Sequence, residues 1–389
     1  MAVLTVIRFL MVGLVLVCFF PWTGHAQEMG VKGLLYGSPE SFAEFHGFVN
    51  LEYFDFQKDG AGTDEGGPGA SSFDQSNFYF NAIAKVRENV TVFGEVEYEH
   101  GGGEVKVDRA FIDWILLDQY LAFRLGKFYA PFGLEIREYQ APVRKLISRP
   151  HFTEDLLYGE WTDIGLNAYG RIGGNSLYAT YDIALANGPK GLRPDVDLQT
   201  NDNNSSRTVI GRLGLDYNGP VQASVGGSYA GGAYDSSNNS RFRLSGGDVK
   251  ITIGGLDIRG EYVSRHGDDQ TIVTTDVIPD CSAVITCTVT AAQSSSTTVA
   301  EGRGFYGQVS YRIMFRKDGL YYLEPVYRHD VFDQSGPDNM ETTDSIGINY
   351  APYPHLVMRG EYQLNKTATP SGVPDPKDNG FLLEAVVDF

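Results

Sequence analysis

The sequence predicts an all-β transmembrane protein, an antiparallel β-barrel of about sixteen strands, on the basis of three observations. Residues 380–389 alternate apolar side chains with polar or small ones and end on Phe389. Tight turns and long polar connections alternate along the chain. After residue 26, no run approaches the roughly 20 apolar residues that a membrane-spanning helix requires. Such a chain enters a bilayer only as a barrel, because the strands satisfy their backbone groups laterally.

The C-terminal strand carries the strongest signal. Alternation with a period of two places its apolar side chains on one face and its carboxylates on the other. An edge strand of a soluble sandwich would leave such a face and an unpaired edge at the terminus, so we favour the closing strand of a barrel. We also expect Phe389 to be the signal that the barrel-assembly machinery reads. The apolar face contains Phe381, Leu383, Ala385, Val387 and Phe389, and the polar face contains Glu384 and Asp388.

The amino terminus predicts export. Residues 1–20 are almost wholly apolar with a single charge, Arg8, and small residues precede Ala26. We expect residues 1–26 to be a cleaved signal peptide, 27–43 to be a periplasmic segment, and 44–389 to form the barrel. The predicted location is the outer membrane of a Gram-negative bacterium, where the outer face of the barrel meets lipid.

The two cysteines that remain after cleavage, Cys281 and Cys287, lie close together in a stretch rich in Thr and Ser. In an oxidising compartment this pair is a candidate for a small loop disulfide. Their spacing lacks nearby His or Cys partners, so we expect no zinc site. The sequence predicts no other metal site and no cofactor.

The connections between predicted strands fall into two sets. The short ones contain turn residues and are expected to be periplasmic, whereas the long polar ones are expected to face the outside. The short connections are residues 88–89, 117–119, 173–175, 218–220, 254–255, 316–319 and 352–354, and the long ones are 58–74, 130–162, 188–206, 232–240, 267–301 and 367–379.

Alternation also assigns charged side chains to the barrel interior. In 305–315, Phe305 and Val309 are expected to face lipid, and Gln308 the interior. Arg-Gly-Glu-Tyr occurs twice, at 259–262 and 359–362. An interior with both signs of charge indicates a water-filled pore, because a packed interior would bury these charges at a large free-energy cost. The arginines assigned to the lumen wall are Arg124, Arg212, Arg259, Arg312, Arg328 and Arg359.

Residues 130–162 form the most informative connection, since long loops are usually functional. Its basic residues crowd between Arg137 and His151. Folded inward, this loop would narrow the pore and place cationic side chains at the constriction; folded outward, it would be a solvated loop. The candidate selectivity residues of the loop are Arg137, Arg144, Lys145 and Arg149.

Three motifs give a specific resemblance. They are Arg-Leu-Gly-Lys-Phe-Tyr-Ala-Pro-Phe-Gly-Leu-Glu at 124–135, Ser-Arg-Pro at 148–150 and Leu-Tyr-Gly-Glu-Trp-Thr-Asp-Ile-Gly at 157–165. The chain resembles the phosphate-selective porins O and P. This resemblance implies a sixteen-stranded trimeric barrel with an inward-folded third loop and passive uptake of anions past a basic constriction that includes Lys127. Tyr129 stands where many relatives place a further Lys, so general porin function is better supported than phosphate selectivity.

Two classes of function follow. The first is a passive diffusion channel for small hydrophilic solutes, with anion or phosphate preference as one form of it. The alternative is a structural sheath that houses a partner such as a periplasmic electron carrier. We expect no enzyme, since the seven His are scattered and no catalytic set has a recognisable spacing. The formal charge of −18 excludes nucleic acid as the expected partner.

Overall fold

The structure, a computed structural model, describes residues 42–57, 71–192, 202–283, 286–298, 300–316, 319–334, 340–368, 376 and 378–389, with backbone alone between 271 and 299. The predicted signal peptide and nearly all of the predicted periplasmic segment lie outside these residues. In the part of the chain that is described, no helix is both long enough and apolar enough to cross a membrane.

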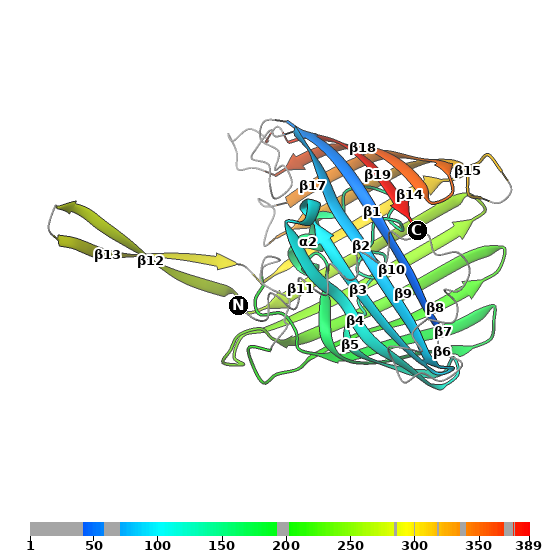
Figure 1. Ribbon diagram of the computed structural model, residues 1–389, viewed down its shortest axis with the longest axis horizontal. Coiled ribbons are helices and arrows are strands. Elements are labelled where there is room, and N and C mark those ends of the chain that lie inside the picture. Colours follow the sequence, from blue (N-terminus) through cyan, green and yellow to red (C-terminus); the bar gives the residue numbers. More distant parts are fainter. Residues whose placement is uncertain are drawn as a thin grey trace, which may run out of the picture.

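The described chain forms a closed antiparallel barrel of sixteen strands (Figure 1), which confirms the predicted fold class. Strands β14 and β15 count as one, because only Arg312 separates them and both pair with β16. The strands of the ring are β1 (Phe42–Phe56), β2 (Ser71–Arg87), β3 (Val90–Glu99), β4 (Glu104–Leu117), β5 (Leu121–Tyr129), β6 (Thr162–Gly173), β7 (Leu177–Ala186), β8 (Thr208–Asn218), β9 (Val221–Ala233), β10 (Arg241–Ile253), β11 (Leu256–Gly267), β14 (Gly302–Tyr311), β15 (Ile313–Met314), β16 (Tyr322–Asp333), β17 (Met340–Tyr353), β18 (Leu356–Thr367) and β19 (Gly380–Asp388).

The first and last strands close the ring. Strand β19 pairs with β1 from Phe48 opposite Asp388 to Phe56 opposite Gly380. The backbone of Phe389 continues this seam: its N–H donates to the Gly47 carbonyl at 2.9 Å, and its carbonyl accepts from the Gly47 N–H at 3.0 Å. The described ring is thus left without an open edge between its first and last strands, which is the condition for a barrel in lipid.

The side chains alternate as the sequence predicts. On β14, Phe305 and Tyr311 are exposed on the outer face, whereas Gln308 is buried inside. On β19, Leu383 is 43% exposed and Glu384 only 4%. The apolar band thus lies outside and the charged groups line the interior.

Two short helical elements and one additional hairpin complete the described chain. The 3-10 turn η2 (His100–Gly102) joins β3 to β4, and α2 (His151–Leu157) lies between β5 and β6. Within the predicted polar loop 267–301, strands β12 (Gln270–Ala283) and β13 (Thr286–Thr298) form a separate two-stranded sheet that extends away from the barrel (Figure 1). The predicted polar connection therefore contains a hairpin.

The hairpin carries both cysteines. Asp280 on β12 pairs with Thr288 on β13, and Ala283 pairs with Thr286, so Cys281 and Cys287 occupy facing strands near the tip. The predicted disulfide stays a prediction.

Candidate functional site

The connection between β5 and β6, residues 130–161, reaches the far side of the ring. We call it the 130–161 segment. Strands β5 and β6 are neighbours, whereas β16 stands opposite them in the strand order. Hydrogen bonds nevertheless join this segment to side chains on β11, β16 and β18. Side chains of these three strands therefore bind a segment that begins on the opposite part of the ring.

Two glutamates of the repeated Arg-Gly-Glu-Tyr motif hold the segment in the same way. Glu261 on β11 accepts hydrogen bonds from the backbone N–H groups of Leu134 and Glu135, both at 2.9 Å. Glu361 on β18 accepts from the N–H groups of Ile147 at 2.7 Å and Ser148 at 2.9 Å. Hydrogen bonds to a charged acceptor contribute roughly 1.5–3 kcal/mol each. The motif that occurs twice in the sequence thus supplies two glutamates that bind the segment backbone in the same way.

Other polar wall residues complete the attachment. Arg328 on β16 donates to the carbonyl oxygen of Ser148 at 2.8 Å and to that of Arg149 at 3.2 Å. Asn349 on β17 donates to the Lys145 carbonyl at 2.9 Å. The wall thus satisfies these backbone polar groups of the segment, as burial requires.

Apolar packing fixes the segment against one part of the wall. Phe152 and Leu156 of α2 are fully buried, and the Phe152 ring stacks on that of Tyr306 at 6.2 Å between centroids. Burying side chains of this size contributes about 1.5–3 kcal/mol each. One cluster unites the segment with the walls formed by β7 to β11, β14 and β16; it includes Phe132, Ile136, Phe152, Leu156, Leu157, Tyr158, Trp161, Phe242, Leu244, Val263, Tyr306 and Phe332.

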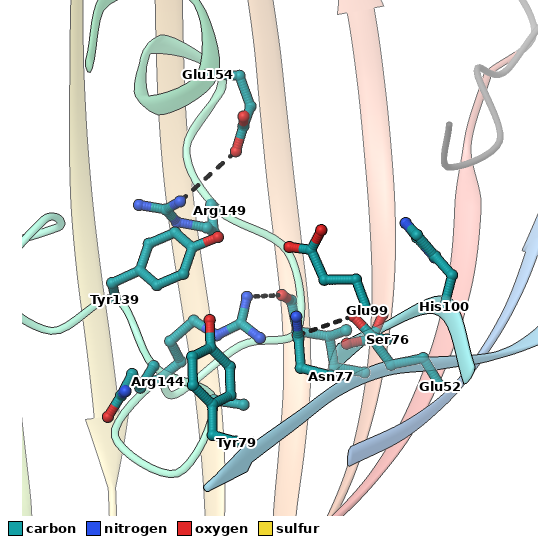
Figure 2. A pocket seen from close by; sticks show the side chains of 13 residues that line it. Glu52, Ser76, Asn77, Tyr79, Glu99, His100, Tyr139, Arg144, Arg149 and Glu154 are labelled. Atoms are coloured by element: carbon teal, nitrogen blue, oxygen red, sulfur yellow. Dashed lines mark hydrogen bonds and ion pairs between the residues drawn. The ribbon is translucent and has the colours of Figure 1, made fainter. Parts of the chain in front are cut away.

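A cavity of ≈ 200 Å³ lies between the segment and the wall formed by β1, β2 and β3 (Figure 2). Its charged lining carries both signs. Arg144, Arg149 and Tyr139 of the segment lie on one side in Figure 2, and Glu52, Glu99 and His100 on the other. The full lining is Glu52, Ser76, Asn77, Tyr79, Glu99, His100, Tyr139, Gln140, Ala141, Arg144, Ile147, Arg149 and Glu154.

Two of the four predicted selectivity residues of the segment line this cavity. Arg144 donates to the Ile147 carbonyl at 3.0 Å and lies 3.8 Å from Glu384. The Arg149 guanidinium lies 4.1 Å from the Tyr139 ring centroid and 3.6 Å from the Glu154 carboxylate. Both arginines are therefore only partly balanced by carboxylates.

The other two lie elsewhere. Lys145 forms an ion pair with Glu324 on β16, and burial lowers its pKa against the opposing effect of that carboxylate. Arg137 lines a separate cavity of ≈ 170 Å³ together with Asp182 and Arg212. The four basic residues are thus spread over three places rather than gathered in one ring.

Lys127 points away from the pore. It sits opposite Ala110 on β4, and cross-strand partners share one face of a sheet. Leu125, two residues earlier on the same face, is 44% exposed on the outside. The Lys127 ammonium donates to the Val107 carbonyl at 2.8 Å, where β4 has a bulge against β3. The expectation that Lys127 contributes to the constriction is wrong for this geometry.

The predicted lumen-wall arginines face the interior, and each has a carboxylate partner. A paired guanidinium presents less net charge to a passing ion than a free one. The pairs are Arg124 with Asp113 at 2.8 Å, Arg212 with Asp248 at 2.5 Å, Arg259 with Asp257 at 2.8 Å and with Glu138 at 2.6 Å, Arg312 with Glu324 at 3.0 Å, Arg328 with Asp330 at 3.1 Å, and Arg359 with Glu384.

Comparisons of the sequence with known proteins give one relative. No known family model matches the chain. An uncharacterised protein of Aquifex aeolicus (strain VF5) is 23% identical over 326 residues, which cover 77% of this chain and 70% of that protein.

Several solved outer-membrane proteins share the architecture. The anion-selective porin of Comamonas acidovorans has a TM-score of 0.58, with 13% identity over 90% of this chain and 100% of that one. OmpT of Vibrio cholerae in a trimer form has a TM-score of 0.54, with 12% identity over 90% and 99%. The outer-membrane channel DcaP of Acinetobacter baumannii also has a TM-score of 0.54, with 12% identity over 91% and 99%. The chain therefore shares the closed β-barrel fold of these outer-membrane porins.

Sequence reasoning missed a carboxylate cluster beside the cavity. One oxygen each of Glu97, Glu99 and Glu160 lies within 4.8 Å of the others, a spacing that suits a metal ion. The Lys106 ammonium, however, lies 3.1 Å from Glu97, 2.8 Å from Glu99 and 3.1 Å from Glu160. A cation of the chain itself thus already contacts all three acids and offsets part of their charge. Alternation on β3 signals the interior position of Glu97, but no sequence pattern joins it to Glu160.

Proposed function

We propose that this protein is an outer-membrane porin, a passive diffusion channel for small hydrophilic solutes, whose third loop is the 130–161 segment folded into the lumen. One observation carries the proposal. The segment begins and ends on adjacent strands, yet Glu261 and Glu361 on the far wall hold its backbone. A connection held in this way narrows the passage and leaves a cavity beside β1, β2 and β3.

The charges of the interior support passage of polar solutes. Side chains of both signs line the cavity beside the segment, and such groups favour water over an apolar filling. Three carboxylates, Glu52, Glu99 and Glu154, face two guanidinium groups, Arg144 and Arg149.

We further propose that ion selectivity is weak. Strong anion or phosphate preference, which the family resemblance implies, requires cationic groups that are free of carboxylate partners. Here the wall arginines are ion-paired, and Lys145 is bound to Glu324. A paired charge attracts a third charge only weakly, and salt screens what remains beyond about 8 Å under physiological conditions.

The sheath alternative receives less support. A sheath needs a wide empty bore for its partner, whereas the apolar cluster of the segment and the wall occupies the part of the interior next to β10, β11, β14 and β16. We also propose that the protein is a homotrimer in the outer membrane, as in the trimer form of the OmpT structure.

Planar-bilayer recording tests the proposal. The purified full-length protein is expected to form stable ohmic pores and to give a reversal potential close to zero in a tenfold salt gradient. Absence of pores under conditions in which a known porin inserts would refute the channel function. A reversal potential near the ideal anion value would refute weak selectivity and restore the anion-selective interpretation.

A further inference from the structure

The ≈ 200 Å³ cavity separates opposite charges across its width. Arg144 and Arg149 belong to the 130–161 segment, whereas Glu52 on β1 and Glu99 on β3 belong to the wall. Figure 2 shows these two sets on opposite sides, with Glu154 above Arg149. A ligand in this space therefore meets guanidinium groups at one end, where Glu154 lies 3.6 Å from Arg149, and the carboxylates of Glu52 and Glu99 at the other.

The guanidinium side has unused hydrogen-bonding capacity. The Arg149 side chain is 8% exposed, and its Nε and Nη2 groups have no hydrogen-bond partner within the described chain. The Nε of Arg144 is likewise without a partner there. A buried donor without a hydrogen-bond partner destabilises the folded protein. A ligand that accepts a hydrogen bond from such a donor removes this cost, and this favours binding. A carboxylate is the acceptor that matches the planar guanidinium fork.

The opposite side has an acceptor for a cation. Glu52 accepts a hydrogen bond from Asn50 Nδ2 at 2.9 Å, and the ion pairs of the described residues include none with Glu52. Glu99 is partly balanced by Lys106 at 2.8 Å. The Glu52 carboxylate also lies close enough to that of Glu384 for the two to repel each other, so an ammonium at this wall would relieve that repulsion.

Size and charge select the class of ligand. An engineered cavity of about 150 Å³ takes up benzene, so ≈ 200 Å³ accommodates a small amino acid. A simple anion is attracted by Arg149 but repelled by Glu52, Glu99 and Glu154. A simple cation is attracted by these carboxylates but repelled by Arg149. A zwitterion satisfies both sides at once.

We propose that this cavity is a binding site for small zwitterionic solutes, free amino acids in particular, with the carboxylate toward Arg149 and Arg144 and the ammonium toward Glu52. The inference names a solute class for the proposed channel and so rests on that function. Binding itself, however, requires only the folded barrel.

Two measurements separate the two proposals. Isothermal titration of the full-length barrel in detergent uses alanine as the zwitterion, lactate as the anion and lactamide as the neutral analogue of similar size. Alanine is expected to bind about tenfold more tightly than either analogue. Bilayer recording then asks whether alanine reduces the ion current through the pore.

Variants test the residues. Arg149→Gln and Glu52→Gln should each weaken alanine binding about tenfold, since each removes one charge-assisted contact. Arg303→Gln removes an outer-face arginine that is paired with Asp333, and should change nothing. Heat-modifiable migration in electrophoresis verifies that each variant folds.

The outcomes are distinct. The inference is overturned, even when pores form, if alanine binds no more tightly than lactamide. It is also overturned if folded Arg149→Gln and Glu52→Gln bind alanine as tightly as the unmodified protein does. Selective alanine binding without any pore sustains the site and removes the channel function instead.

Discussion

The carboxylate of Glu361 accepts a hydrogen bond from the backbone N–H of Ile147 at 2.7 Å, although the two residues are 214 positions apart. The same carboxylate group also accepts from Ser148, and Arg328 donates to the Ser148 carbonyl at 2.8 Å. This short stretch of the 130–161 segment is therefore bound through its backbone, so its position depends on the wall more than on its own side chains.

Removing this clamp should release the segment. Glu361→Ala leaves two backbone N–H groups without an acceptor. Because these hydrogen bonds go to a charged group, their removal should weaken attachment of the segment by about 3 kcal/mol. Trypsin should then cleave after Arg144 or Lys145 at least about tenfold faster than in the unmodified barrel. Glu44→Ala, a change at a side chain that is 54% exposed, is the control. Equal resistance of both variants would show that the clamp is dispensable.

The segment arginines should influence selectivity. Arg144→Gln combined with Arg149→Gln leaves Glu52, Glu99 and Glu154 as the main charges of the cavity. The reversal potential is expected to shift toward cations, and the shift should grow at low salt because screening weakens. If the double variant behaves like the unmodified pore, ions do not pass this cavity, and the wall arginines become the better candidates.

Orientation follows from the connections. Single cysteines at Asn175, between β6 and β7, and at Asn238, between β9 and β10, are introduced after replacing Cys281 and Cys287 with Ser. In whole cells an impermeant maleimide should label Asn238→Cys and spare Asn175→Cys. The opposite pattern would reverse the predicted topology.

The hairpin cysteines should form a bridge. Mass spectrometry of the protein purified without reductant is expected to find Cys281 linked to Cys287. Reduction should leave the barrel folded, because so small a ring contributes a few kcal/mol at most and the strands of the barrel bond laterally without it. Two free thiols after isolation from an oxidising compartment would contradict this prediction.

His151 should make stability depend on pH. Burial lowers its pKa, but the hydrogen bond to Glu341 at 2.7 Å and the charge of Asp330 outweigh burial and raise the pKa above 6.5. A raised pKa adds stability that is fully present below the unfolded value of about 6.5 and is lost as pH rises through the folded value. The stability difference between the unmodified protein and His151→Gln should therefore be larger at about pH 5 than at about pH 9. A difference independent of pH would contradict this.

Alternation makes the barrel predictable from sequence. Period-two patterns on β14 and β19 depend only on neighbouring residues, so the order of residues alone assigns both faces of these strands. The same rule applies to Lys127, which stands three residues from Arg124. An odd spacing on one strand puts the two side chains on opposite faces, so Lys127 and Arg124 could not both face the lumen.

The candidate site is less accessible to sequence reasoning. The crowding of basic residues marks the 130–161 segment, but their partners are far away in the chain: Glu324 lies 179 residues from Lys145. Hairpin β12–β13 was not predicted, because its many Thr and Ser residues are typical of a polar loop. Strand pairing at the tip depends on backbone register, which polar composition does not reveal.

The contact between Ile147 and Glu361 has a consequence for biogenesis. Strand β18 and the closing strand β19 are the last of the ring to be synthesised, so the segment cannot dock until nearly the whole chain is present. Until the segment docks, Phe152 and Leu156 are not held against the wall that buries them. An unfinished barrel thus displays an apolar surface and a trypsin-accessible loop, and completion of the last strands removes both in one step.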